Sequence, residues 1–339
     1  MALKNNSTGR RGVKRSLART GILRLAGFFM PASVIVLMYH SVLDDPHDCA
    51  DSIGIGNIHG TYVFRKQMEF LARNYNPVSL EDIRLFLSGQ KAMPRKSVAL
   101  TFDDGYADNF EVAAPVLTRL GVPATFYLTV DSVKTGTLPW FCHLRHSFAK
   151  TRKKSWIDLL GRSWPLEDEA ARAEAFCAAC ESLTQLSGDS QQQALRAVER
   201  DLNAEPLVRK KNLMMTWEQA RRMCQDGHVL GSHSLPHPNM TYIADKDLNY
   251  ELIESKREME DELAMPVVHF SYPAASLTGS STRRTLAATK QAGYLTAVTT
   301  TPGLVNNGDD PLALPRIGAP RDFEEFQWVL QSVPLVLSS

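Results

Sequence analysis

The sequence of 339 residues has no long uninterrupted apolar run and almost no excess charge of either sign. Its apolar N-terminal stretch, residues 20–31, is broken by Arg24, so it is too short and too interrupted to cross a bilayer. It also lacks the continuous apolar region and the small-residue cleavage site of a secretory signal. Because 38 Lys and Arg residues balance 37 Asp and Glu residues, the overall charge does not indicate a nucleic-acid partner.

Cysteine is scarce as well, and the five cysteines are scattered along the chain. An odd, scattered set argues against a disulfide framework and favours a reducing compartment. Cys177 and Cys180 form a CxxC pair, which is a pattern of redox sites and of half zinc sites. No second CxxC completes a zinc site, and the pair lies in an Ala-rich, helix-like stretch, so we predict a structural role for both cysteines.

Basic residues are concentrated in the N-terminal segment 1–32. A basic segment with an apolar face is typical of a peptide that lies on an anionic membrane surface, and a disordered tail has the same composition. With the poor secretory signal and the odd cysteines, this composition predicts a cytoplasmic protein that is peripheral to the inner membrane through residues 1–32.

From residue 33 to residue 339 the pattern is that of one large domain in which strands and helices alternate. Such alternation indicates parallel βαβ units, and this number of strands favours a closed or nearly closed barrel. The predicted fold class is therefore α/β, a distorted (β/α)7–8 barrel. Residues 136–212 have helical periodicity and few strand signals, and we predict that they form a helical insertion. The strands are predicted at 34–42, 98–102, 124–130, 228–234, 267–273, 295–300 and 312–317.

Two adjacent carboxylates, Asp103 and Asp104, follow the predicted buried strand 98–102 directly. Gly105 then allows a sharp turn into the next helix. Neighbouring aspartates at a strand end repel each other, so they need a cation, a shared proton or solvent. The alternative is an Asp-Asp-Gly turn whose carboxylates cap the helix.

A second group of polar residues is the histidine pair His233 and His237, which are four residues apart. On a single helical turn this spacing places both imidazoles on one side, as a divalent metal requires. Pro236 and Pro238 make a long helix unfavourable, so we predict an isolated, rigid turn. The alternative is two unrelated histidines in a Pro-rich loop. Two histidines and one carboxylate leave coordination positions open, which is typical of a catalytic metal site.

These motifs resemble a known family. Thr-Phe-Asp-Asp-Gly-Tyr (101–106) and His-Ser-Leu-Pro-His-Pro (233–238) are similar to the first two motifs of the polysaccharide deacetylases, the NodB-homology or carbohydrate esterase 4 group. The segments 37–42, 121–126 and 270–273 resemble the subgroup that includes poly-N-acetylglucosamine deacetylases. The resemblance covers roughly residues 34–317 without the insertion, and it implies a barrel of the NodB-homology type.

The resemblance also implies roles for individual residues. Asp103 would be the general base, and the metal ligands would be Asp104, His233 and His237. This division fits general chemistry, because a metal lowers the pKa of water and a free carboxylate beside it can accept the proton. Zinc is the first expectation for the metal, although the same donors also accept iron, cobalt or nickel. The backbone N–H of Ala274 would stabilise the oxyanion, with Tyr272 beside it.

The sequence departs from the family pattern at three places. Ser271 and Ala275 stand where the third motif often has arginine and glycine, so Arg316, at the end of a predicted strand, is our candidate to orient Asp103. The family often uses a late histidine as general acid, but no histidine follows His269. His40 is our candidate for that role, and a structural histidine is the alternative.

Several aromatic residues are candidates to stack on sugar rings near the site, although we expect most of them to pack in the core. Trp140 and Phe141 open the insertion, which we therefore expect to form one wall of the site. The candidate platforms are Tyr106, Trp140, Phe141, Trp217 and Tyr272.

The predicted function is a metal-dependent hydrolase that removes N-acetyl groups from N-acetylhexosamine units of a polysaccharide or oligosaccharide. From the predicted location, the glycan could be lipid-linked or nascent. Hydrolysis of O-acetyl esters or of a non-sugar amide would use the same site. An inactive carbohydrate-binding homologue is the alternative outside enzymes; the joint presence of Asp103, Asp104, His233 and His237 argues against it.

Overall fold

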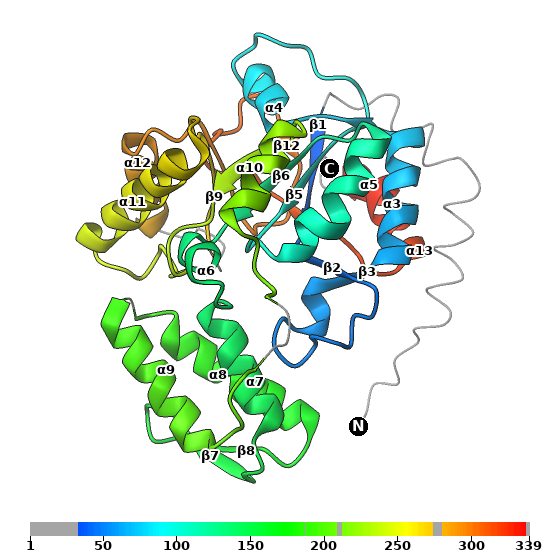
Figure 1. Cartoon of the computed structure of the whole chain (residues 1–339). Helices are drawn as coiled ribbons and strands as arrows, with labels where there is room; N and C mark the ends of the chain where they lie inside the picture. The colour runs from blue at the N-terminus through cyan, green and yellow to red at the C-terminus, as the bar shows by residue number, and fades with distance from the viewer. Residues whose placement is uncertain (1–32, 187, 209–211, 274–279, 337–339) are drawn as a thin grey trace.

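The computed structural model describes residues 33–186, 188–208, 212–273 and 280–336 (Figure 1). The basic segment 1–32 lies outside the described residues, as does Ala274. Within these ranges, no helix has the length and apolar character needed to span a bilayer.

Parallel strands form the centre of the molecule. The ring is completed by the segment 314–318, because Leu314 bridges to Val298 and β13 (Ile317–Gly318) pairs with β1 in parallel. The prediction of a distorted (β/α) barrel is therefore confirmed. The other strands of the ring, in spatial order, are β1 (Ser33–Tyr39), β5 (Ser97–Phe102), β6 (Ala124–Leu128), β9 (Val229–Ser232), β10 (His269–Ser271) and β11 (Thr296–Val298).

Helices cover the outside of this ring (Figure 1). The additional strands are β2 (Ser41–Leu43), β3 (Ile58–Gly60), β4 (Asn76–Pro77) and β12 (Val305–Asn306). Among these short strands, β4 pairs with β5 and β12 pairs with β1, whereas β2 and β3 form a separate two-stranded sheet. The helices of the barrel are α3 (Thr61–Asn74), α4 (Leu80–Leu87), α5 (Ala114–Leu120), α6 (Val130–Thr135), α10 (Trp217–Gln225), α11 (Asp245–Leu263), α12 (Ser280–Gln291) and α13 (Phe323–Val336).

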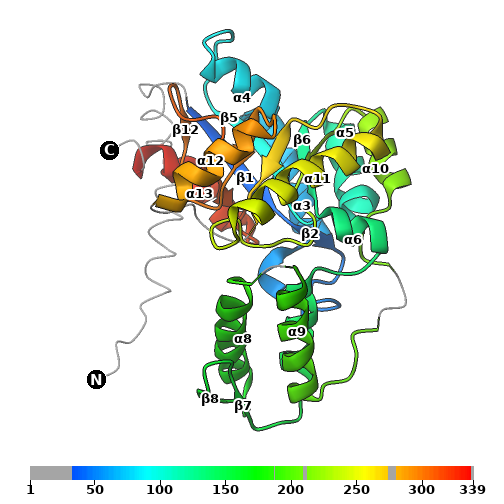
Figure 2. The ribbon, with the colours of Figure 1, turned by 90° about the vertical axis from the view of Figure 1, so that its left-hand side faces the viewer.

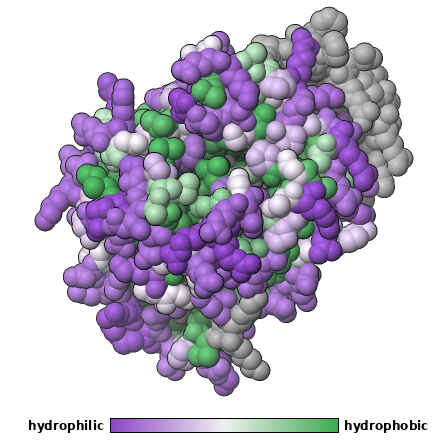
Figure 3. All heavy atoms as spheres, turned by 45° about the horizontal axis from the view of Figure 1, so that its top comes forward, coloured by the Kyte–Doolittle hydropathy of each residue, from purple (hydrophilic) through white to green (hydrophobic). Residues whose placement is uncertain are grey.

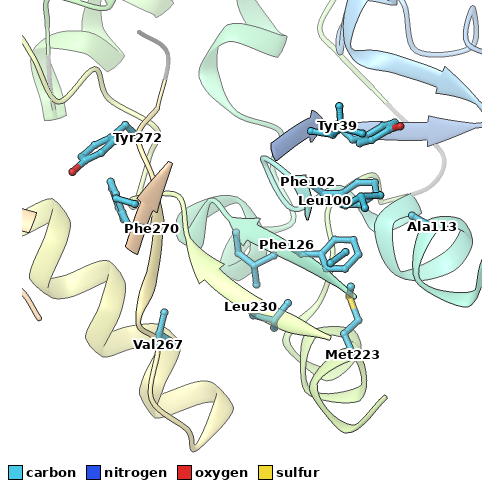
Figure 4. Close-up of a cluster of buried hydrophobic side chains, with 14 of the residues drawn as sticks. Tyr39, Leu100, Phe102, Ala113, Phe126, Met223, Leu230, Val267, Phe270 and Tyr272 are labelled. Atoms are coloured by element: carbon cyan, nitrogen blue, oxygen red, sulfur yellow. The ribbon is translucent and has the colours of Figure 1, made fainter. Parts of the chain in front are cut away.

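Alternation along β5 explains how the strand serves both the core and the site. Successive side chains of a strand point to opposite faces. Leu100 and Phe102 belong to the large apolar core between strands and helices, where Phe102 stacks on Phe126 with ring centroids 4.6 Å apart (Figure 4). The alternate residue Thr101 therefore faces the inside of the barrel, and the same alternation carries Asp103 to the inner mouth.

The inside of the barrel is filled at its amino end by a second apolar cluster, in which Ala99 and Tyr127 pack with residues of α4. This helix begins at a capping box formed by Ser79 and Asp82. Close packing inside the ring also explains Gly231 in β9, because an added Cβ would lie 2.6 Å from the Tyr127 ring.

The insertion forms a separate layer beside the carboxyl end of the barrel strands (Figures 1 and 2). It consists of α7 (Trp140–Lys150), a hairpin of β7 (Ser155–Ile157) and β8 (Ser163–Pro165), α8 (Glu169–Leu183) and α9 (Gly188–Leu202). Its own apolar cluster includes Phe148 and Trp156. Helices dominate it, although the hairpin was not predicted. Cys177 and Cys180 lie on α8 as free cysteines.

The surface around the α4 end is mostly hydrophilic, with apolar side chains in small patches between polar ones (Figure 3). The apolar residues that determine the fold are therefore mainly inside, in the clusters described above.

Candidate active site

The central contact of the site is a buried ion pair between Asp103 and Arg316. Asp103 is 2% exposed and Arg316 is 1% exposed. The guanidinium binds both carboxylate oxygens, with Nη1–Oδ1 and Nη2–Oδ2 each at 2.7 Å. This planar two-point contact fixes the orientation of the carboxylate as well as its charge.

Arg316 is itself held by three further hydrogen bonds. Its Nε donates to the carbonyl of Thr299 at 2.8 Å. Its Nη1 and Nη2 also donate, each at 3.1 Å, to the hydroxyls of Thr101 and Ser271. Ser271 stands where the family often has arginine, and here it contacts the arginine that comes from residue 316. The structure thus brings together the two residues that the sequence analysis paired.

The charge on Asp103 depends on this arginine. Burial alone would raise the pKa of the Asp103 carboxyl, but the Arg316 guanidinium, together with smaller contributions from His233 and His40, outweighs burial and holds the pKa well below its usual range. Asp103 is therefore ionised at neutral pH.

Asp104, His233 and His237 form a compact donor cluster next to this ion pair. Oδ1 of Asp104 lies 3.5 Å from Nε2 of His233 and 3.6 Å from Nε2 of His237. These distances are long for hydrogen bonds, whereas two ligands about 2.05 Å from a tetrahedral metal are separated by about 3.3 Å. All three residues are buried, and their donor atoms lie within 4.8 Å of one another. The donor set therefore fits a divalent metal.

Hydrogen bonding and burial prepare the two imidazoles for ligation. Nδ1 of His233 lies 2.8 Å from the carbonyl of Ser271, so we assign the proton to Nδ1, which leaves Nε2 free to ligate. Burial lowers the pKa of His237 to about 4, so this ring is neutral at pH 7. Burial also acts to lower the pKa of His233, but the carboxylates of Asp103 and Asp104 outweigh it and raise that pKa, so a metal must displace a proton there.

The predicted helical turn between His233 and His237 is absent. The segment is an irregular loop in which Ser234 and His237 have φ values of 67° and 68°. Pro236 and Pro238 restrict φ and lack N–H donors, so they oppose a hydrogen-bonded turn. The loop nevertheless brings the two rings together, with centroids 4.7 Å apart.

Backbone strain is concentrated at this cluster. Six non-glycine residues with positive φ occur in the described ranges, and three of them are Asp104, Ser234 and His237. Such conformations cost about 1–3 kcal/mol each and persist where the surroundings enforce them. Holding Asp104 and His237, two of the three metal-compatible residues, in these conformations therefore lowers the stability of the fold.

The insertion contacts the site directly through its first helix. Nε1 of Trp140 donates to the carbonyl of His237 at 3.1 Å, and the Phe141 ring lies 4.8 Å from the His237 ring. The chain returning from the insertion also binds the first motif, because the N–H of Met215 donates to the carbonyl of Gly105 at 2.9 Å. Both ends of the insertion thus support the site loops.

Sequence reasoning missed two buried carboxylates that support the site loops. Asp108 accepts from the Ser41 hydroxyl at 2.7 Å and from the Val42 N–H at 2.8 Å. Glu251 accepts from the Leu235 N–H at 3.0 Å, between the two histidines. Burial raises both pKa values to about 7. Asp108 was detectable from its position just after the first motif, whereas nothing local marks Glu251.

The remaining predicted residues have different placements. His40 is half-buried at the end of β1, and its positive form would stabilise both Asp103 and Asp104 as anions. Tyr272 is 1% exposed, and its hydroxyl lies 3.1 Å from the carbonyl of Leu312, which accepts, and 3.0 Å from the Thr289 hydroxyl. It lies in the core beside Phe270 (Figure 4), so its ring has no free face for a sugar.

Among the other predicted platforms, Tyr106 is fully buried, and its hydroxyl lies 3.6 Å from the Cys142 sulfur. Trp217 is half-buried against the main core. Trp140 and Phe141 are half-buried at the site itself. The insertion residues are therefore the aromatic side chains best placed to meet a substrate.

Fold and site together define a (β/α) barrel protein with a carboxylate–arginine pair and a metal-compatible Asp-His-His cluster at the carboxyl ends of the strands. The family model described as "Polysaccharide deacetylase" matches residues 90–297. This chain therefore belongs to the polysaccharide deacetylase family.

Individual relatives agree with this assignment. The putative polysaccharide deacetylase YxkH of Bacillus subtilis is 23% identical over 288 residues, which are 85% of this chain and 71% of that protein. The poly-beta-1,6-N-acetyl-D-glucosamine N-deacetylase of Escherichia coli K12 is 40% identical over 67 residues, which are 20% of this chain and 10% of that protein.

Solved structures share the fold. The Streptococcus pyogenes deacetylase PplD, in complex with acetate, gives a TM-score of 0.59 at 19% identity, covering 89% of this chain and 99% of that chain. IcaB from Ammonifex degensii gives a TM-score of 0.56 at 16% identity, covering 89% and 98%. The predicted NodB-type barrel is thus confirmed by its structural neighbours.

The buried Asp103–Arg316 ion pair should contribute to the free energy of unfolding. Arg316→Gln leaves a buried carboxylate without its partner, and we expect the free energy of unfolding to fall by about 3–5 kcal/mol. Asp103→Asn should lower it as well, and the double variant should lose at least about 1 kcal/mol less than the sum of the single losses, because the partners interact. Urea denaturation of the chelator-treated proteins measures all four states, and strictly additive losses would contradict the pairing.

Proposed function

We propose that this chain is a metal-dependent de-N-acetylase that acts on N-acetylhexosamine units of a polysaccharide or oligosaccharide. The observation that carries the proposal is the pairing of an ionised, Arg316-bound carboxylate with the adjacent three-donor cluster. Neither part alone specifies hydrolysis, but together they provide a base beside a metal site that has open positions.

The metal would be held by Asp104, His233 and His237, with zinc as the first expectation. When bound, a divalent ion polarises the acetyl carbonyl and lowers the pKa of water. The reaction also needs a base that does not bind the metal. Asp103 can serve as this base, because its ion pair with Arg316 keeps it from turning toward the cluster as a further ligand.

Asp103 would accept the proton of the attacking water. Each carboxylate oxygen receives one hydrogen bond from Arg316. The Ser271 hydroxyl lies 3.4 Å from both oxygens, but it has one proton to donate, so at least one oxygen keeps a lone pair free. Because its pKa is low, Asp103 is in the accepting form at any pH at which the histidines are neutral. It would hold the proton only transiently, since its proton affinity is low.

His40 would return a proton to the leaving amine. Its backbone carbonyl accepts from the Asn109 side chain at 2.7 Å, which fixes the strand end that carries it. It is half-buried, so it is reachable from solvent and can be reprotonated. The oxyanion would be stabilised by the N–H of Ala274, which lies outside the described residues.

The substrate class follows from the family and from the wall that the insertion provides. The printed name of the E. coli relative is that of an N-deacetylase of poly-beta-1,6-N-acetyl-D-glucosamine, and this chemistry is the first to test here. Trp140 and Phe141 are half-buried beside His237, where an aromatic face can stack on a sugar ring. We propose that the substrate is a lipid-linked or nascent glycan at the inner membrane.

The function is tested by amine release from N-acetylglucosamine oligomers, after chelation and after zinc is added back. We expect activity to require added metal, and Asp103→Asn to lower kcat/KM by about 100-fold or more while metal remains bound, because a general base contributes about 10²–10⁴ in rate. Asp261→Asn, at a solvent-exposed ion pair with Arg257, is the matched control and should retain activity.

Metal-loaded wild-type protein that releases no amine from any N-acetylated glycan would contradict the proposal. Turnover of acetyl esters alone would reassign the same site to O-acetyl hydrolysis.

The proposed role of the insertion is tested by Trp140→Ala. Loss of a stacking contact of about 1–1.5 kcal/mol should lower kcat/KM for an N-acetylglucosamine tetramer about tenfold. Trp164→Ala, which removes a half-buried tryptophan from the hairpin at the other end of the insertion, should leave it unchanged. An equal loss for a small acetylated substrate would show that Trp140 acts through His237 and does not contact the glycan.

A further inference from the structure

The turn between β7 and β8 presents apolar side chains to solvent at the end of the insertion that lies away from the barrel (Figures 1 and 2). Ile157 is 62% exposed, Leu159 is 51% exposed and Leu160 is 88% exposed. Of the large apolar side chains in the described ranges, Leu160 is the most exposed. Ile157 ends β7, and Leu159 and Leu160 lie in the turn that follows it. Together these three residues form a patch, which we name the hairpin tip.

The hairpin tip is a turn in which several backbone donors are satisfied internally. The Asp158 carboxylate accepts from the N–H groups of Leu160 and Arg162 and from Nε1 of Trp164, each at 2.9 Å. The N–H of Asp158 donates to the carbonyl of Arg162 at 2.9 Å. Because these donors do not depend on water, the tip can enter a less polar medium at low cost.

The two faces of the hairpin differ, so the exposed apolar residues are not the ones that attach the hairpin to the core of the insertion. Trp156 is 4% exposed and packs edge-on against Phe148 of α7, with ring centroids 5.2 Å apart. Ile157 follows it in the strand and therefore points to the opposite face. The inner face is already packed on the insertion core, so the apolar tip is additional to the core.

Basic side chains accompany the tip. Arg152, Lys153 and Lys154 are exposed just before β7, and the Arg162 guanidinium lies 4.3 Å from the centre of the Trp164 ring. Acidic side chains also lie nearby: Asp158 holds the turn as described, and at the start of α8 Asp168 accepts from the Ala171 N–H at 2.8 Å. Glu167 and Glu169 are also exposed there, and Glu205 lies 3.8 Å from Arg152 at a site where both side chains are over 85% exposed.

We infer that the hairpin tip docks the protein on an anionic lipid bilayer, with Leu159, Leu160 and Ile157 at headgroup depth and the basic residues on lipid phosphates. A small convex tip suits a lipid surface, because a stable protein interface buries about 800 Å² on each partner. Insertion of the three apolar side chains is the main contribution to such binding. Each basic residue near the surface adds about 1 kcal/mol, and the exposed carboxylates of Glu167, Glu169 and Glu205 oppose part of this gain. The insertion would then connect the membrane to the strand-end site.

The test is sedimentation of the full-length protein with vesicles of phosphatidylglycerol mixed with phosphatidylcholine. We expect the double variant Leu159→Ser/Leu160→Ser to bind about 10- to 100-fold more weakly than wild type. The matched control is Tyr250→Ser/Ile253→Ser, which removes two exposed apolar side chains from α11 and should bind as wild type does. Hydrolysis of soluble oligosaccharides should be the same in all three proteins.

A second arm changes charge instead of apolar area. Lys153→Gln/Lys154→Gln should weaken binding to the anionic vesicles at low salt, and vesicles of pure phosphatidylcholine should show no such change. The inference is overturned if the wild-type protein does not bind anionic vesicles, or if the tip variant binds them as tightly as wild type. It is also overturned if the tip variant differs from wild type only in having lost self-association, as measured by sedimentation velocity. The second result would assign membrane binding to another segment, such as residues 1–32, and the third would assign the tip to a second copy of this chain.

Discussion

The buried contact between Asp103 and Arg316 is the interaction on which the site depends. Two adjacent carboxylates at one strand end cannot remain charged in the protein interior without compensation. The structure separates them: Asp103 is neutralised by an arginine inside the barrel mouth, and Asp104 faces two imidazoles. This separation fits the proposed roles, in which Asp103 is the base and Asp104 is a metal ligand.

The same arginine links the site to the closure of the barrel. Arg316 belongs to the segment 314–318, which completes the ring between β11 and β1. Its backbone N–H donates to the carbonyl of Thr301, and its Nε donates to the carbonyl of Thr299. The ring therefore cannot close in this register without placing the guanidinium opposite Asp103. Around this centre, α7 binds the His237 loop from the side of the insertion, so one segment both covers the site and extends to the hairpin tip.

Much of this arrangement could be predicted from sequence, because the relevant signals are local. Alternating strand and helix patterns indicated the barrel. The Ser79/Asp82 and Thr216/Gln219 pairs have the spacing of capping boxes, and the structure has such boxes at the starts of α4 and α10. The site residues were found because they follow strands whose carboxyl ends meet at one edge. The loop from His233 to His237 was predicted as a helical turn because spacing alone does not reveal its left-handed backbone. The carboxylate of Glu251 and the burial of Tyr272 depend on long-range packing, which no local pattern encodes.

The most direct measurement of the central claim is a calorimetric zinc titration of the chelator-treated wild type, Asp104→Asn and Asp103→Asn proteins. The account predicts one zinc ion per wild-type chain. It predicts an affinity at least about 100-fold weaker in Asp104→Asn, which lacks a ligand, and within about tenfold of wild type in Asp103→Asn, which keeps all three. Equal losses in the two variants, or no binding by wild type, would contradict the division of roles between the neighbouring aspartates.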